Sequence, residues 1–311
     1  MQKWGRNKSG SYRFRCLSCA SSATRKRPDI TSLSHQKLYE NWLLNKLTLT
    51  DFGIKYGVSR RTLDRWFKPF RDKDITPIKL DVRGGVLIID GYCLQRGATV
   101  LIAQTTSNKV VNWSFTCTEN FETWLEFFNN IPSFPRVIVC DGQKGMLKAI
   151  KLRWPGIAIQ RCQFHVIHHV NILLTKKPET RAAQKLKIVV QDIINIKTRD
   201  DLKIWLVNYK HWHLDFGSFL KEKTYQADNL TLTGRPKWHY THGRLHAAHS
   251  HLKNAFPSLF QYLKIASVPN TSNRIEGGIN AQIQRHVDFH RGTTLFQRRQ
   301  IIAAFLKQKQ R

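Results

Sequence analysis

Three acidic residues occupy positions where a carboxylate could bind a metal ion. Asp90 follows the apolar run Val86–Ile89, and Asp141 follows the run Arg136–Cys140. Glu276 comes far downstream, at the start of an expected helix. A carboxylate at the mouth of an apolar strand is costly to desolvate unless a partner compensates its charge. Two such residues, with a third that the fold could bring alongside, predict a site for divalent cations.

The charge of the chain favours a polyanion as its partner. Lys and Arg total 51 against 21 Asp and Glu, a formal net charge of +30 over 311 residues. Such an excess attracts nucleic acids of any sequence through counterion release. On composition alone, the alternative is a ribosome-associated or merely soluble basic protein. An apolar content of 41% excludes a disordered basic tail and predicts packed cores.

The cysteines and the hydropathy pattern indicate an intracellular protein. Six cysteines are scattered, mostly in apolar stretches, which is typical of a reducing compartment. No apolar run approaches the roughly 18–20 residues of a membrane span. The first residues lack the apolar segment of a signal peptide. We therefore expect no membrane partner.

A basic segment, residues 1–30, contains a C-x-x-C pair. Cys16 and Cys19 have the spacing of one half of a four-ligand zinc ribbon. The second half is absent, because no Cys or His precedes Cys16 and the next His is His35. Zn²⁺ binding is one interpretation of this pair, and two ordinary thiols are the other.

Residues 31–72 are predicted to form a helix-turn-helix domain. Leu33–Leu44 supplies a first helix, Thr50 can cap a second, Gly57 permits a left-handed turn, and Ser59 caps a third. The third helix turns its polar residues outward, namely Arg60, Arg61, Thr62 and Arg65. We expect these residues to bind bases and phosphates. The alternative is an ordinary three-helix packing unit with solvated arginines.

Residues 82–165 alternate between strand and helix patterns. Three strands are followed by helix, strand, helix and strand; the expected ranges are 86–89, 99–105, 109–115, 120–130, 136–140, 144–154 and 157–160. This is the order of the ribonuclease-H-like fold, an α/β fold whose first and fourth strands are neighbours. Asp90 and Asp141 would therefore reach shared metal ions. We assign 82–165 and 266–311 to this catalytic domain.

Residues 166–265 are predicted to form a helical insertion before the last helix of that domain. Thr271 or Ser272 is expected to cap that helix, which would place Asn273, Glu276 and Asn280 on one face. The insertion is basic, and we expect it to contact phosphates through Arg235, Lys237, Arg244 and Lys253. The alternative is a helical lid that only covers the sheet.

Four motifs together resemble those of Mutator-type bacterial insertion-sequence transposases. They are Ile89–Gly91, Val139–Gly142, Arg161–His165 and Pro269–Gly277. The resemblance spans nearly the whole chain and implies the DDE class, with a ribonuclease-H-like catalytic domain and an all-helical insertion. It implies that Asp90, Asp141 and Glu276 are the catalytic acids.

The same resemblance assigns supporting residues. Cys162 and His165 match the C-x-x-H motif of the family, whose implied position is beside the active site. A metal-binding face with His168 and His169 is chemically possible, although a packed Cys with hydrogen-bonded or DNA-facing histidines is favoured. Asn273 would orient groups near Glu276. Such relatives carry a full zinc ribbon, so we expect the start of this chain to be truncated.

The implied activity is DNA transposition. Two Mg²⁺ or Mn²⁺ ions would support hydrolysis at each transposon end, and the exposed 3′-hydroxyl would then attack target DNA. The implied partners are double-stranded DNA, as terminal inverted repeats and target, and further copies of the chain assembled on it, in the bacterial cytoplasm at the nucleoid. The alternatives are a catalytically dead DNA-binding regulator and a ribonuclease-H-like nuclease without strand transfer.

Overall fold

The computed structural model describes residues 1–8, 10–24, 28–230, 236–290 and 292–310, without the side chains of 28–33, 227–230, 274 and 276. It divides into two compact units. Unit 1 comprises Met1–Ile75 and His286–Ala304, and unit 2 comprises Thr76–Arg285 and Phe305–Arg311. None of the described helices has the length and apolar character needed to cross a membrane.

Unit 1 contains a small antiparallel sheet and a group of helices. The sheet consists of β1 (Gln2–Arg6), β2 (Tyr12–Arg15) and β3 (Ser22–Thr24). The helices are α1 (Pro28–Leu44), α2 (Leu49–Tyr56) and α3 (Arg60–Arg71). Tyr39, Phe52, Leu63 and Phe67 form their core together with Ile301, from α11 (Leu295–Gln308). The sequence analysis had assigned this stretch of α11 to the catalytic domain.

Local capping explains the turn between α2 and α3. Gly57 ends α2 with φ 65°, a left-handed conformation that glycine adopts without strain. Ser59 then caps α3 by accepting a hydrogen bond from the backbone N–H of Thr62 at 3.2 Å. Both features confirm the sequence analysis. The expected cap at Thr50 is wrong, because Thr48 caps α2 and Thr50 lies inside it.

Unit 2 is built on a mixed five-stranded sheet of order β6-β5-β4-β7-β8. Its strands are β4 (Val86–Gln95), β5 (Ala98–Thr105), β6 (Val110–Thr116), β7 (Val137–Cys140) and β8 (Ala158–Arg161). Strands β4, β5 and β6 pair antiparallel, whereas β4, β7 and β8 pair in parallel. The α/β class is confirmed, and the first and fourth strands of the sheet are neighbours.

The two faces of this sheet bury different residues. Leu87 and Ile89 of β4 pack against α4 (Phe121–Asn129) and α5 (Lys144–Arg153) through Trp124 and Ile150. The alternate residues of the strands face the other side, where they cluster with Val268 and Ile275; they are Val86, Ile88, Val137 and Val139. This second face bears on the candidate site.

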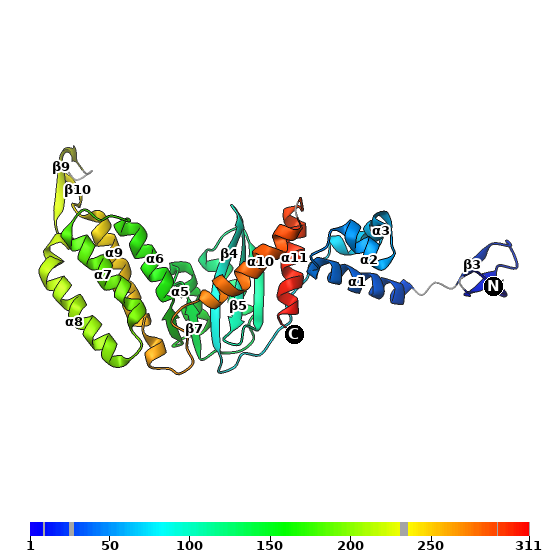
Figure 1. Ribbon diagram of the computed structural model, residues 1–311, viewed down its shortest axis with the longest axis horizontal. Coiled ribbons are helices and arrows are strands. Elements are labelled where there is room, and N and C mark those ends of the chain that lie inside the picture. The colour runs from blue at the N-terminus through cyan, green and yellow to red at the C-terminus, as the bar shows by residue number, and fades with distance from the viewer. Residues whose placement is uncertain (9, 25–27, 231–235, 291, 311) are drawn as a thin grey trace. The chain divides into compact units, whose positions relative to one another are not determined.

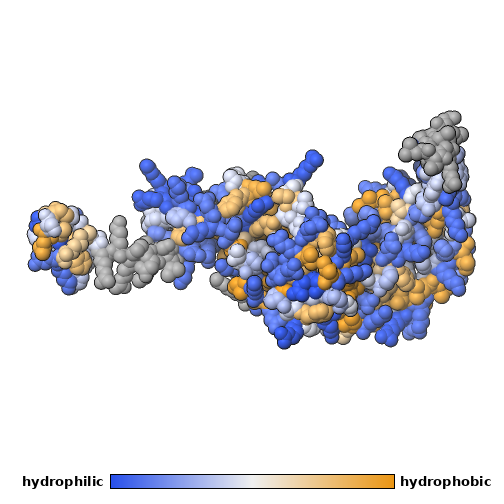
Figure 2. Space-filling view, turned by 180° about the vertical axis from the view of Figure 1, so that it is seen from behind, coloured by the Kyte–Doolittle hydropathy of each residue, from blue (hydrophilic) through white to orange (hydrophobic). Residues whose placement is uncertain are grey.

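The insertion lies beside the sheet (Figure 1) and has its own hydrophobic core. Its main helices are α6 (Gln163–Leu174), α7 (Arg181–Gln191), α8 (Arg199–Phe216) and α9 (Gly243–Ala255). Short 3-10 turns cover Asp192–Asn195, Gly217–Leu220, Phe256–Ser258 and Gln261–Leu263. The expectation of an all-helical insertion is wrong, because β9 (Lys223–Leu230) and β10 (Pro236–Tyr240) form an antiparallel hairpin. On the face in Figure 2, hydrophilic residues cover most of this part.

The chain then returns to the sheet through a π-helix, Arg274–Asn280, followed by α10 (Ala281–Phe289). Asn273 is its N-cap residue and makes no capping hydrogen bond through its side chain. The expected cap at Thr271 or Ser272 is therefore wrong. The shared face of Asn273, Glu276 and Asn280 assumed α-helical spacing, which a π-helix with its i→i+5 hydrogen bonds does not have.

Candidate functional site

Asp90 lies inside a strand rather than at its end, contrary to the sequence analysis. The parallel pairing of β4 with β7 stops at Ile88, opposite Val139, while the antiparallel pairing with β5 continues to Gln95. The side chain of Asp90 is 6% exposed. Asp90 therefore stands just beyond the point where β4 and β7 separate.

Asp90 and Asp141 continue the two strand positions that face the cluster around Ile275. Side chains two residues apart in a strand point the same way, and each aspartate comes two residues after a member of the cluster around Ile275, namely Ile88 and Val139. Asp141 directly follows β7 and is half-buried. Its Oδ1 accepts a hydrogen bond from the backbone N–H of Gln143 at 3.0 Å, which fixes the turn after the strand.

The backbone at Glu276 approaches this same face. Ile275 is fully buried in the cluster with Ile88 and Val139, so the residue before Glu276 anchors the π-helix beneath the two aspartates. The side chain of Glu276 lies outside the described residues. Farther along, the hydroxyl of Tyr92 in β4 donates a hydrogen bond to Gln284 of α10. These contacts bring three distant stretches of sequence together.

The chemistry of these residues suits a hard divalent cation. Mg²⁺ and Mn²⁺ prefer carboxylate oxygens, and Asp90 and Asp141 supply such donors from neighbouring strands. Within the described part of the chain, no group of three His, Cys, Asp or Glu residues is close enough to hold a metal ion. The predicted third carboxylate, Glu276, has a side chain outside that part.

Arg161 is a buried cation beside Asp141 that the sequence analysis did not single out. Its Nη2 donates to the backbone carbonyl of Asp141 at 3.2 Å. Burial lowers its pKa, while Cys140 and Asp141 oppose that effect. Gly142 makes room for it: φ is +83°, and a Cβ here would lie 2.1 Å from Nε of Arg161. This contact explains the glycine after Asp141.

Glu119 is a further carboxylate near the site, but it lies on the opposite face. A Cβ on Gly91 would lie 2.8 Å from Oε2 of Glu119. Because strand residues alternate, that Cβ would be on the face opposite the side chain of Asp90, and Glu119 therefore lies on that opposite face. Burial, with a smaller contribution from the charge of Asp141, raises the pKa of Glu119. Glu119 is thus a neighbour of the candidate site and lies outside its donor set.

Cys162 and His165 tie the start of α6 to the segment before the π-helix. The backbone N–H of Ser272 donates to Sγ of Cys162 at 3.3 Å, and Oγ of Ser272 lies 3.5 Å from Nδ1 of His165. Burial acts to raise the pKa of Cys162, but hydrogen bonds from His165 and Ser272 outweigh it and lower the pKa. Next to them, the N–H of Gln163 donates to the carbonyl of Asn270 at 2.9 Å. The motif therefore joins two chain segments.

Four other histidines of the insertion pack against rings. His168 stacks on Phe164, and His169 lies 4.3 Å from His251 between ring centroids. Nε2 of His249 is 2.9 Å from the hydroxyl of Tyr209. Burial, aided by neighbouring cations, lowers the pKa of both His249 and His251 to about 4.

These depressed pKa values predict acid sensitivity. The unfolded chain binds protons at these histidines near pH 6.5, whereas the folded chain does so only near 4. Their contribution to the free energy of unfolding is complete above pH 6.5 and is lost as the pH falls towards 4. We expect His249→Gln to lessen the acid-induced fall in Tm by a few degrees. Thermal melts at pH 7 and pH 4.5 check this, with the exposed His211→Gln as control; equal falls in both variants would contradict it.

The predicted DNA-binding residues of α3 lie at the surface, with one exception. Arg60, Arg61 and Arg65 are exposed. Thr62 is half-buried, and its hydroxyl lies 2.9 Å from that of Ser59, so it belongs to the helix cap. A salt bridge of 2.6 Å links Asp64 to Arg71 and leaves the first turns of α3 strongly basic.

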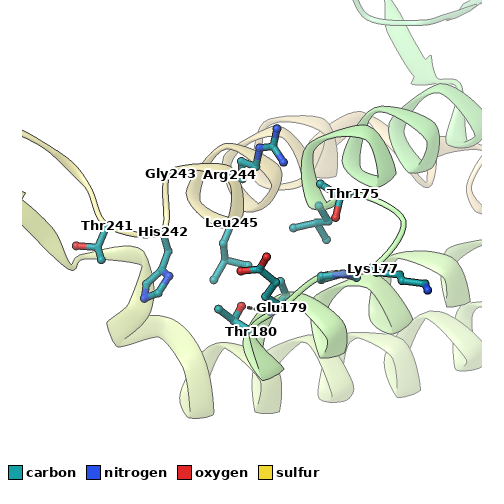
Figure 3. A pocket seen from close by; sticks show the side chains of 12 residues that line it. Thr175, Lys177, Glu179, Thr180, Thr241, His242, Gly243, Arg244 and Leu245 are labelled. Atoms are coloured by element: carbon teal, nitrogen blue, oxygen red, sulfur yellow. Dashed lines mark hydrogen bonds between the residues drawn. The ribbon is translucent and has the colours of Figure 1, made fainter.

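The predicted phosphate contacts of the insertion are also exposed. Lys237 lies on β10, and Arg244 and Lys253 lie on α9, whereas Arg235 is outside the described residues. Arg244 lines a pocket between the starts of α7 and α9 (Figure 3). The carboxylate of Glu179 is turned into this pocket beside Leu245, which disfavours an anion inside it.

The C-x-x-C pair lies in the turn between β2 and β3. Backbone and side-chain hydrogen bonds, first that from the backbone of Cys19 and then those from Ser18, lower the pKa of Cys16 to about 6. A thiolate is the form that binds metal. The two thiols are half of a tetrahedral ligand set, and no third ligand joins them among the residues described.

Comparison with known families bears on the segment that joins β4 to the insertion. Residues 96–212 match the Mutator family of transposases. The match runs from the β4–β5 turn through β7, Asp141, Cys162 and His165 into α8. It confirms the resemblance to Mutator-type transposases inferred from the motifs. No curated protein matches the chain at a significant level.

Proposed function

We propose that this chain is a DNA transposase of the DDE class that cuts the ends of its element and joins them to target DNA. One observation carries the proposal: β4 and β7 pair in parallel, and Ile88 and Val139, each two residues before one of the aspartates, pack with Ile275, the neighbour of Glu276. The match of residues 96–212 to Mutator transposases supports the reaction class. The strand order supports a ribonuclease-H-like catalytic domain.

In this proposal, Asp90, Asp141 and Glu276 hold two Mg²⁺ or Mn²⁺ ions. When bound, such ions activate a water molecule and stabilise the leaving oxygen of a phosphodiester. The chain itself orients the carboxylates: the hydrogen bond from Gln143 fixes the turn at Asp141, and the buried Ile275 anchors the π-helix. Cys162 and His165 hold Ser272, in the segment before the π-helix. Asn273 orients groups near Glu276.

Arg161 has a positioning role in this account. Its guanidinium holds the carbonyl of Asp141 and lies over Gly142, so opening the turn after β7 would take a hydrogen-bond acceptor from a buried cation. Its positive charge also offsets the repulsion between neighbouring carboxylates.

DNA is bound in this proposal by a helix-turn-helix head and by the insertion. The Ser59-capped α3 presents Arg60, Arg61 and Arg65 to the terminal repeat, and Cys16 and Cys19 contribute to a Zn²⁺ site. More than one copy of the chain acts on the paired ends. The setting is the bacterial nucleoid.

A cleavage assay tests the proposal against its rivals. The full chain is incubated with Mg²⁺, DNA carrying the inverted repeats that flank its gene, and a target plasmid. A transposase yields cut ends with 3′-hydroxyls and joined products. Cut ends without joined products would indicate a nuclease. Binding to the repeats without any cut would indicate a DNA-binding regulator.

The insertion is expected to grip phosphates. Replacing Arg235, Lys237, Arg244 and Lys253 by alanine should lower affinity for duplex DNA and reduce the salt slope of binding by about 3–4 units, because each phosphate contact contributes about 0.9. The control replaces four other exposed lysines of the insertion, namely Lys176, Lys185, Lys203 and Lys210. A salt titration in which both variants show the same slope would leave the insertion as a lid.

A further inference from the structure

The β9–β10 hairpin carries its aromatic residues on one face. Trp238 pairs with Tyr225 across the two strands, and Tyr240 pairs with Lys223. Directly paired residues share a face of an antiparallel sheet, and so do residues two positions apart. The three rings and the lysine therefore form one row, which we call the aromatic row.

One end of the aromatic row is held by the insertion and the other is open. Tyr240 stacks on His246 of α9, with ring centroids 3.8 Å apart and an interplanar angle of 13°. Trp238 meets Tyr240 edge-on at 5.2 Å. Beyond this anchor, Trp238 is 45% exposed and Tyr225 is 61% exposed. Figure 1 shows the hairpin projecting beyond the helices of the insertion.

Positive charge surrounds the open rings. Nζ of Lys223 lies 3.8 Å from the centroid of the Trp238 ring, a cation–π contact. Lys221 precedes the hairpin, and Lys237 adjoins Trp238 on the opposite face of the strand; both are exposed. Cross-strand pairing contributes to the stability of the hairpin, but the exposed parts of Trp238 and Tyr225 bury no area against the rest of the chain. Flat rings beside cations match a ligand that is itself flat and attached to an anion.

We propose that the aromatic row is a stacking site for an unpaired DNA base, with the lysines on its adjacent phosphates. The charge favours nucleic acid over an apolar protein surface. An unpaired base is required, because bases inside a duplex are already covered on both faces, and only an unstacked one can offer a face to Trp238. This inference rests on the proposed function and adds an intermediate to it: DNA with a base displaced from the stack.

The test compares two DNAs with the full-length chain. One is a perfect duplex, and the other is the same duplex with a single unpaired 2-aminopurine. Wild type should bind the second more tightly and quench its fluorescence. Trp238→Ala should lose about 5- to 150-fold in affinity for the unpaired-base DNA alone. Trp238→Phe should retain most of the wild-type affinity for the unpaired-base DNA, because phenylalanine keeps an aromatic ring.

The matched control is His239→Ala, since His239 is exposed and lies on the opposite face of the same strand. It should bind both DNAs as wild type does. If Trp238→Ala does not fold, Tyr225→Ala serves in its place, with the same expected loss. Equal affinity of wild type and Trp238→Ala for the unpaired-base DNA, with duplex binding intact, would overturn the stacking site and leave the proposed function standing. Absence of binding to either DNA by wild type would overturn both.

Discussion

Asp90→Asn and Asp141→Asn should each reduce Mg²⁺-dependent DNA cleavage by at least about 100-fold, while DNA binding stays near the wild-type level. Each change removes one negative charge at almost constant volume, so the sheet remains intact while the donor set for the metal is broken. Losing a single electrostatic contact to a reacting centre typically costs 10²–10³ in rate. Glu276→Gln should behave in the same way.

Glu119→Gln is the control for this prediction. Glu119 is also a carboxylate near Asp141, but it lies across the sheet from Asp90. It should cleave as wild type does, and its Tm at pH 7 should be equal or higher, because a charge whose pKa is raised by burial destabilises the fold above that pKa. Cleavage above one-tenth of the wild-type rate in Asp90→Asn, or loss of cleavage in Glu119→Gln, would show that the catalytic site lies elsewhere.

Replacing Arg60, Arg61 and Arg65 together by alanine should abolish recognition of the terminal repeat. All three are exposed on the Ser59-capped α3, whose buried residues face the core of unit 1. Contacts to bases are worth about 1–3 kcal/mol each, so the loss in specific binding should reach several kcal/mol. Gel shifts with repeat and scrambled duplexes measure this difference.

The control for the arginines removes the same charge elsewhere in unit 1. Lys37, Lys55 and Lys68 are exposed on α1, α2 and α3, and their alanine variant should weaken repeat and scrambled DNA alike. The arginine variant should instead lower the ratio between the two DNAs. If the ratio of repeat to scrambled affinity is unchanged in the arginine variant, the three helices are only a packing unit and do not recognise the repeat.

Local chemistry made the turn between α2 and α3 and the main strands predictable. Gly57 and Ser59 specify that turn through the conformation and hydrogen bond of single residues. The apolar runs before Asp90 and Asp141 likewise marked β4 and β7. The end of β4 was missed, because its second half is held by antiparallel pairing to β5 rather than by an apolar run.

Features that depend on distant residues were not predictable. The packing of Ile301 with Tyr39, and the approach of Arg161 to Gly142, leave no periodic signal in the chain. The π-helix at Glu276 departs from the 3.6-residue period on which helix prediction relies. The β9–β10 hairpin was read as part of a helical insertion, since its strands lack a buried face and are held by cross-strand pairs.

The central claim is that Asp90 and Asp141 bind the metal ions of a DNA-cutting site. Titration of Mn²⁺ into the full-length chain, with free Mn²⁺ followed by electron paramagnetic resonance, measures this binding without relying on cleavage. The account predicts about two ions bound per chain. It predicts that the Asp90→Asn/Asp141→Asn double variant, folded by circular dichroism, loses them while Glu119→Gln retains them. Equal binding by wild type and the double variant would contradict the account.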